Sequence, residues 1–211
     1  MIEKPILFSG PMVRAILEGR KTMTRRIVKQ PNEMGVQGAP VSVAPYNTVA
    51  PERGLAYYWK SGGSWNSSQP IKLAYEVGDV CWVRESHAIV GTTDPGFVLY
   101  RADGYEAECR RHGFDNPPPE SSVRWRPSIH MPRWACRIRL RVTAVKVERL
   151  NSISEEDAMA EGAEPIYGCH LPGHDPAPYW WGFSSLWSSI HGPGSWDANP
   201  FVAAYSFERV A

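Results

Sequence analysis

Residues 19–26 (GRKTMTRR) hold the side chains of this chain that are best suited to chemistry. This stretch contains one lysine, two threonines and three arginines. A guanidinium group binds phosphate through paired N–H donors, and an ammonium group polarises a carbonyl oxygen. The stretch therefore suits an anionic or carbonyl-bearing ligand, although short basic runs are also common as solvated turns with no specific role.

A short helix over residues 11–17 is expected to position this stretch. A capping serine, a proline in the first turn and a glycine after the last apolar residue mark its two ends. In the extended chain that follows, side chains alternate, so Lys21 and Arg25 would face one way and Thr24 and Arg26 the other.

The composition is that of a globular protein without a strong overall charge. Of the 211 residues, 43% are hydrophobic and 21% charged, and the net charge is +1. Binding to nucleic acid would therefore need a local basic patch rather than a global field. Nine tryptophans and nine tyrosines could fill a core or stack on bases.

We expect no signal peptide, because the first residues lead directly into a strand-like run, and no apolar run in the sequence is long enough to span a membrane. Four widely spaced cysteines form no C-x-x-C pair. We therefore expect a cytoplasmic protein with reduced thiols.

Short strands separated by long loops predict an α+β fold, mostly β, built on a small β-barrel with short helices. The clearest strand covers residues 136–150, and its apolar alternation shifts phase at residues 144–145, which indicates a bulge or bend. First and last strands of similar hydrophobicity could pair to close the barrel. We expect one domain over residues 1–211, with loop insertions at about 30–75, 105–122 and 163–182, and a short helix from Glu155 to Glu161 that Ser154 caps.

Aromatic, cationic and hydroxyl side chains gather in residues 125–134 (WRPSIHMPRW). Trp125 and Trp134, together with Trp82 in an earlier strand, could stack on a base. Core packing is the alternative, above all for Trp82. Ser128, His130 and Arg133 are candidate ligand contacts; His130 could also serve as an acid or base, or be structural.

Other charged residues have two interpretations each. Glu85, at the end of a strand, could pair with Arg84 or a turn arginine, or line a pocket. The arginines at 137, 139 and 141 form either a solvated strand face or a track for phosphates. Cys109, His112, Cys169 and His174 are types of side chain that bind zinc, but their spacing matches no standard zinc module, so no metal or other cofactor is predicted.

The order of these features resembles the ASCH domain of the PUA-like superfamily, in its phage and prophage form. The resemblance is carried by residues 5–8 (PILF), 19–26, 78–85 (GDVCWVRE) and 125–134, by the long strand, and by the helix at Ser154. It implies a PUA-like barrel and a role with RNA or a modified nucleoside. In one branch, which is shorter than this chain, a lysine, a threonine and a glutamate hydrolyse the acetyl amide of N4-acetylcytidine. Lys21, Thr24 and Glu161 match these three; another branch cuts RNA with other residues.

Amide hydrolysis by these three side chains is chemically reasonable. Thr24 could act as a nucleophile or orient a water molecule, Lys21 could take the proton, and Glu161 could hold the lysine or protonate the leaving amine. Arg25 or Arg26 could stabilise an oxyanion or hold a phosphate. The alternatives are a plain ion pair between Lys21 and Glu161, an RNA-binding module without catalysis, and a phage protein that binds host proteins.

Overall fold

The computed structural model describes residues 3–28, 55–59, 68–91, 96–168 and 178–210. The chain forms two compact units. The first unit comprises Met1–Lys21, Val80–Arg141 and Arg209–Ala211, and the second comprises Thr22–Asp79 and Val142–Glu208. Each is described by itself below.

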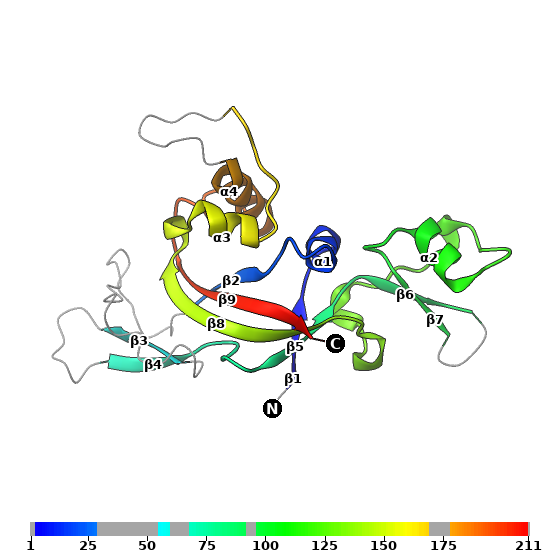
Figure 1. Cartoon of the computed structure of the whole chain (residues 1–211), viewed down its shortest axis with the longest axis horizontal. Coiled ribbons are helices and arrows are strands. Elements are labelled where there is room, and N and C mark those ends of the chain that lie inside the picture. Colours follow the sequence, from blue (N-terminus) through cyan, green and yellow to red (C-terminus); the bar gives the residue numbers. More distant parts are fainter. Residues whose placement is uncertain (1–2, 29–54, 60–67, 92–95, 169–177, 211) are drawn as a thin grey trace. The chain divides into compact units, whose positions relative to one another are not determined.

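The first unit contains a parallel strand pair joined to the start of a long strand. Its elements are β1 (Glu3–Leu7), α1 (Gly10–Leu17), β5 (Val80–Arg84), β6 (His87–Val90), β7 (Phe97–Tyr100), α2 (Tyr105–His112), the 3-10 turns η3 (Glu120–Ser122), η4 (Ser128–His130) and η5 (Arg133–Ala135), and the beginning of β8 (Arg139–Arg149). β1 runs parallel to β5, and β5 pairs antiparallel with β8. The β6–β7 hairpin packs beside α2 (Figure 1). Leu99 and Met131 are buried at the centres of two apolar clusters.

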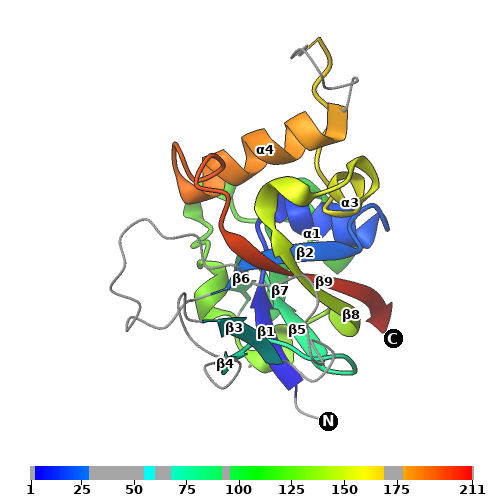
Figure 2. The ribbon, with the colours of Figure 1, turned by 90° about the vertical axis from the view of Figure 1, so that its left-hand side faces the viewer.

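The second unit is a sheet covered on one side by helices. Its elements are β2 (Met23–Ile27), β3 (Leu55–Trp59), β4 (Ser68–Lys72), the rest of β8, η6 (Leu150–Ser152), α3 (Glu155–Ala160), α4 (Pro178–His191) and β9 (Phe201–Val210). β2 pairs antiparallel with β9, and β3 with β4. Figure 1 shows α3 and α4 on one side of β8 and β9, and Figure 2 shows the same layering after a turn of 90°. Phe183, Trp187 and Trp196 fill the core between the helices and the sheet.

Local sequence signals predicted several of these elements. The expected helices are α1 and α3, and Ser154 caps α3 by accepting a hydrogen bond from the Asp157 N–H at 3.1 Å. The phase shift in the long strand is confirmed, since Thr143 and Ala144 are exposed in succession while Val142 and Val145 are buried.

The predicted α+β class, rich in sheet, is confirmed, but the pairing expected to close a barrel is wrong. The strand order is β1-β5-β8-β9-β2, so β9 lies between β8 and β2, and β1 pairs with β5. The sheets formed by the described residues are open. The supposed loop at 105–122 contains α2, and α4 starts at Pro178, inside the supposed insertion 163–182. Most of the insertion at 30–75 lies outside the described residues.

Candidate functional site

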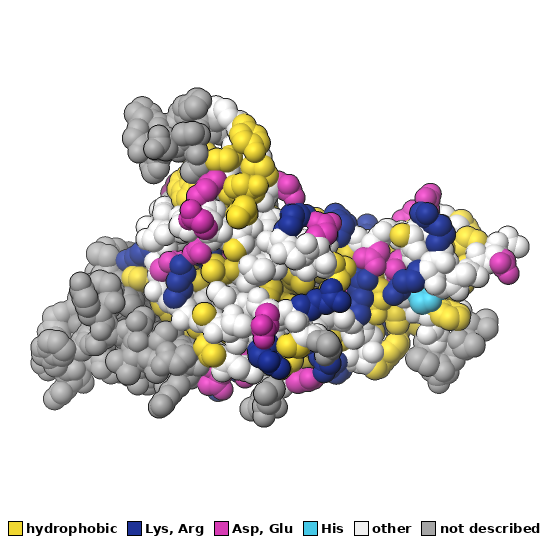
Figure 3. Space-filling view, in the orientation of Figure 1, with side chains coloured by type: hydrophobic (Ala, Val, Ile, Leu, Met, Phe, Trp, Pro, Cys, Tyr) yellow, Lys and Arg dark blue, Asp and Glu magenta, His cyan; other side chains and the backbone are white. Residues whose placement is uncertain are grey.

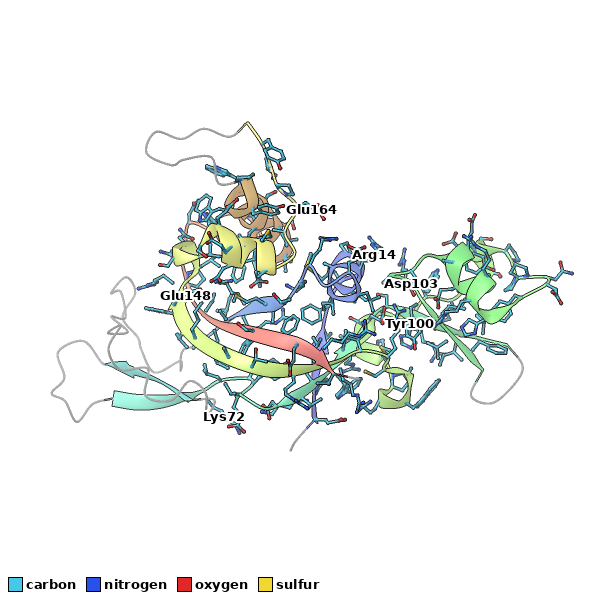
Figure 4. All side chains as sticks on the ribbon, in the orientation of Figure 1. Arg14, Lys72, Tyr100, Asp103, Glu148 and Glu164 are labelled. Carbon is cyan, nitrogen blue, oxygen red and sulfur yellow. The ribbon has the colours of Figure 1, made fainter. Side chains whose placement is uncertain are left out.

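Arg25 of β2 is enclosed by carboxylates in the second unit. Its guanidinium has no exposed surface and donates to Glu148 at 2.6 Å, Asp157 at 2.6 Å and Glu161 at 3.2 Å. The ring of Phe183 lies 6.0 Å from the guanidinium carbon. Figure 4 labels Glu148, which reaches this group from β8. Arg25 and these three carboxylates are called the Arg25 cage below.

Mutual contacts within the Arg25 cage favour the charged forms of Arg25 and Asp157. Burial would lower the pKa of Arg25, but Glu161, Glu148 and Asp157 raise it above its ordinary value. Burial also opposes ionisation of Asp157, yet hydrogen bonds from Lys146 and Arg25 hold the pKa of Asp157 below its usual value. The Lys146 ammonium lies 2.5 Å from Asp157 and 3.3 Å from Glu148. Arg25 is thus committed to protein carboxylates, a different role from the expected contact with a phosphate or an oxyanion.

The three residues predicted to be catalytic are all buried. Lys21, Thr24 and Glu161 are each 4% exposed. Lys21 is the last residue of the first unit, where its backbone N–H donates to the Ala15 carbonyl at 3.0 Å and its ammonium lies 5.5 Å from the centre of the Phe8 ring. Thr24 and Glu161 belong to the second unit.

Strand alternation separates Thr24 from the Arg25 cage. Arg25 points toward α3 and α4, so Thr24 and Arg26 point to the other face of β2. Thr24 pairs directly with Tyr205 of β9, and directly paired residues share a face. Thr24 therefore lies on the same face as Arg26 and Tyr205, and Glu161 reaches β2 from the opposite face.

That second face bears a cavity of about 520 Å³. Its lining combines two tyrosine rings, Tyr75 and Tyr205, with the cations Arg26 and Lys72 and with His191. The tyrosine rings meet edge to face at 5.2 Å, and the Tyr205 hydroxyl accepts a hydrogen bond from the Ala74 N–H at 3.2 Å. Burial, with a smaller effect of Arg26, lowers the pKa of His191. Such a cavity suits a flat ligand that carries negative charge.

The sequence indicated only part of this cavity. Arg26 was a candidate, and Tyr205 was placed in a strand, but Lys72, Tyr75 and His191 were not singled out. The residues come from β2, β4 and the segment after it, α4 and β9, and no short motif connects parts so far apart in the chain.

A separate charged network lies in the first unit around Arg137. Its guanidinium binds Glu85 at 2.8 Å and Asp103 at 2.5 Å, and it lies 3.9 Å from the centre of the Tyr100 ring. Burial raises the pKa of Glu85 despite Arg137, whereas the hydrogen bond from Arg137 lowers the pKa of Asp103. Figure 4 labels Tyr100 and Asp103 beside each other. Glu85 therefore pairs with Arg137, and the expected pairing with Arg84 or a turn arginine is wrong.

The remaining candidates lie on the sheet and turns of the first unit. Trp82 is half-buried on β5, with the guanidinium carbons of Arg84 and Arg133 at 5.3 and 5.6 Å from its ring centre. Ser128 is half-buried and His130 exposed, both in η4.

The residues with zinc-binding side chains are not seen together. Cys109 is buried in α2, and the His112 ring stacks on Phe114 with 5.6 Å between ring centres. Cys169 and His174 lie outside the described residues. Among the residues that are described, no three His, Cys, Asp or Glu side chains form a group that could hold a metal ion. In the same part of the chain, no helix has both the length and the apolar character needed to cross a membrane.

Comparison of the chain with protein-family models, with curated proteins and with solved structures found no match.

Proposed function

We propose that this chain is an ASCH-type, PUA-like protein that recognises a nucleobase, nucleoside or nucleotide in the cavity between β2, β4 and β9. The observation that carries the proposal is the lining of that cavity, which places Tyr75 and Tyr205 beside Arg26 and Lys72. Tyrosine rings contact the flat faces of bases, and cations bind phosphate oxygens. The volume of about 520 Å³ falls in the range of small-molecule sites, about 300–1,000 Å³.

Calorimetric titration with nucleosides and their 5′-monophosphates tests this proposal. The monophosphate is expected to bind more tightly than the nucleoside, because only the monophosphate contacts Arg26 and Lys72. Arg26→Met and Lys72→Met should each weaken monophosphate binding by about 10- to 100-fold, which corresponds to the loss of one charged hydrogen bond. Arg110→Met, which removes an exposed cation of α2, is the matched control. If none of the 5′-monophosphates of adenosine, guanosine, cytidine and uridine binds at millimolar concentration, the proposal is overturned.

A second candidate function is hydrolysis of an acyl amide on the bound base, as in N4-acetylcytidine. It is favoured by the burial of Thr24 and by its position directly opposite the cavity residue Tyr205. Thr24 would attack the acetyl carbonyl or orient the water that does so, and Lys21 would take the proton. Lys21 would return this proton to the leaving amine as the C–N bond breaks, which releases cytidine. Where water is the nucleophile, acetate is released in the same step; where Thr24 is the nucleophile, a water molecule then hydrolyses its acetyl ester and releases acetate. Glu161 contacts Arg25 on the opposite face of β2, so this candidate function gives Glu161 no direct part in the reaction.

Chromatographic assay of acetate and cytidine release from N4-acetylcytidine checks this activity. Lys21→Ala and Thr24→Val are each expected to lower the rate by at least about 100-fold. Thr22→Val removes an exposed threonine two residues from Thr24 and should leave the rate unchanged. If the protein binds N4-acetylcytidine tightly but does not hydrolyse it, the hydrolase activity is excluded and the binding function remains.

A further inference from the structure

The part of the second unit that contains α3, α4 and β9 is acidic. Residues 150–208 include eight aspartates and glutamates and no lysine or arginine, although the whole chain has 23 lysines and arginines. Arg25 of β2 and Lys146 of β8 bind Asp157 at 2.6 and 2.5 Å, on the side of α3 that faces the sheet. The fixed charge that α3, α4 and the segment between them present to water is therefore negative.

One face of α3 combines an apolar side chain with carboxylates. Met159 is 50% exposed and lies three residues after Glu156 and four after Glu155, spacings that place side chains on the same face of a helix. Because Glu155 accepts hydrogen bonds from the Tyr179 and Trp180 N–H groups, this face lies beside the first turn of α4. Glu156 is exposed, and its carboxylate has no ion pair with any residue that the structure describes.

The segment after α3 continues this face beside the first turn of α4. The Ile166 N–H donates to the Pro178 carbonyl at 2.9 Å, which ties the segment to α4. Ile166 is 38% exposed and Tyr167 is 78% exposed. Figure 3 shows hydrophobic side chains, in yellow, gathered over α4 and this segment. The α3–α4 face, as named below, consists of Glu156, Met159, Ile166 and Tyr167.

The composition of the α3–α4 face narrows the class of partner that it suits. Large apolar side chains gathered at the surface are typical of interaction sites. Nucleic acids and anionic membranes repel carboxylates, whereas a polypeptide with lysines or arginines beside its apolar side chains is attracted to them. The described residues of α3, α4 and the segment between them form no strand, so an extended partner cannot add to a sheet here. Packing of side chains from a helix fits this surface better.

We propose that the α3–α4 face binds an amphipathic helix of a partner protein, with lysines or arginines beside its apolar stripe. The apolar stripe packs against Met159, Ile166 and Tyr167, and the flanking cations lie beside Glu156. The α3–α4 face belongs to the second unit alone. The proposal goes beyond the function of the cavity and stands whether or not the cavity binds a nucleotide.

Fluorescence anisotropy of the full chain with a labelled helical peptide of about 18 residues tests the proposal. The lysine peptide has leucines at helical spacing and lysines elsewhere, and the glutamate peptide has glutamate in place of every lysine. The lysine peptide is expected to bind with a micromolar Kd that weakens as salt rises, and the glutamate peptide should bind at least about 10-fold more weakly.

Two variants separate the apolar and the charged contributions. Tyr167→Ala should weaken binding of the lysine peptide by about 5- to 30-fold, the range expected for a side chain that matters at an interface. Its core stays intact, because the Tyr167 side chain is largely exposed. Glu156→Gln should weaken binding by about 2- to 5-fold and reduce its salt dependence, as loss of one exposed ion pair would.

The matched controls remove the same kinds of side chain from exposed positions of the first unit. Trp134→Ala removes an exposed ring, and Glu120→Gln removes an exposed carboxylate of η3. Neither should change the affinity for the lysine peptide. Equal losses in the controls and in the α3–α4 variants would overturn the proposal, as would equal affinity for the two peptides or no binding of the lysine peptide at millimolar concentration.

Two other occupants of the α3–α4 face are tested separately. Sedimentation of the chain alone would overturn the proposal if it revealed a dimer that Tyr167→Ala dissociates, because a second copy would then cover the face. Binding to phosphatidylcholine vesicles that Tyr167→Ala abolishes would overturn it in favour of a lipid surface. A monomer that leaves such vesicles unbound and still binds the lysine peptide supports the partner helix.

Discussion

At the scale of single residues, the two neighbouring arginines of the basic stretch have opposite environments. Arg25 is buried among carboxylates, and Arg26 lines the cavity. The cause is strand alternation, which turns successive side chains to the two faces of β2. One side of the strand thus carries a buried ion cluster, and the other carries a cation that lines the cavity.

Replacement of Arg25 should cost far more stability than replacement of a surface cation. Arg25→Met would leave Glu148, Asp157 and Glu161 without their shared partner, and loss of one member of a buried ion pair costs about 3–5 kcal/mol. Lys146→Met is the comparison, because Lys146 is half-exposed and such pairs contribute about 1 kcal/mol or less. Urea denaturation of the two variants measures the difference. A loss below about 1 kcal/mol for Arg25→Met would mean that water or protonation removes the cost of burying the three carboxylates without their cation.

At the scale of elements, α3 and its following segment position α4. The Glu155 carboxylate accepts hydrogen bonds from the Tyr179 and Trp180 N–H groups, each at 2.8 Å, and so satisfies donors in the first turn of α4. Further along α4, Gly182 lies directly against the backbone at Glu164. Helix α4 therefore approaches this segment more closely than any side chain would allow.

Gly182→Ala should destabilise the protein even though alanine favours helices. A β-carbon at position 182 would lie 1.8 Å from the Glu164 carbonyl oxygen, and backbone cannot move aside cheaply. We expect a loss of about 3 kcal/mol, which outweighs the gain of about 1 kcal/mol in helix propensity. Ser185→Ala, at an exposed position of the same helix, should change the free energy of unfolding by less than about 0.5 kcal/mol. An unchanged melting temperature for Gly182→Ala would show that the segment at Glu164 can withdraw from the helix.

The elements that the sequence predicted are those with local signals. Caps and terminal glycines marked α1 and α3, and apolar alternation marked β8. Helix α2 was missed because its buried positions include Glu108, whose carboxylate accepts from the Tyr100 N–H at 2.7 Å and from Arg111 at 2.6 Å. A buried carboxylate fills a core position without adding to a hydrophobic pattern, so periodicity gave no sign of this helix.

At the scale of the whole molecule, local sequence patterns could not predict which strands pair when the strands lie far apart in the chain. The parallel contact of β1 with β5 joins Glu3 to Val80, and no turn fixes that register. The same holds for the candidate site. The sequence supplied Thr24, Arg26 and Glu161 as residue types, but the face that each occupies follows from pairing with β9 and from docking of α3. Composition and helix caps thus predicted the fold class and several helices and strands. Tertiary contacts determine which side chains meet at the candidate site.

The stability of the whole chain should fall in two stages as the pH decreases. The first stage should depend on two histidines whose pKa values burial lowers, His191 and the more deeply buried His87. This residue is fully buried, its Nδ1 lies 3.3 Å from the Glu85 carbonyl oxygen, and its Nε2 has no hydrogen-bond partner among the described residues. Burial lowers the pKa of His87, so below about pH 6.5 the unfolded chain takes up a proton that the folded chain resists. Stability contributed by neutral His87 is thus present above about pH 6.5 and is lost on acidification, by at most about 1.4 kcal/mol per pH unit.

The second stage should come from the carboxylates whose pKa values are lowered, Asp103 and Asp157. Their contribution is present above about pH 3.9 and is lost as the pH falls further, whereas the raised pKa of Glu85 acts in the opposite direction. Urea denaturation at pH 7, 6 and 5 isolates the first stage. His87→Leu should flatten the loss over this range, and His130→Leu, which removes an exposed histidine of the same unit, should retain it. Equal slopes for wild type and His87→Leu would show that the buried imidazole is reached by water before the chain unfolds.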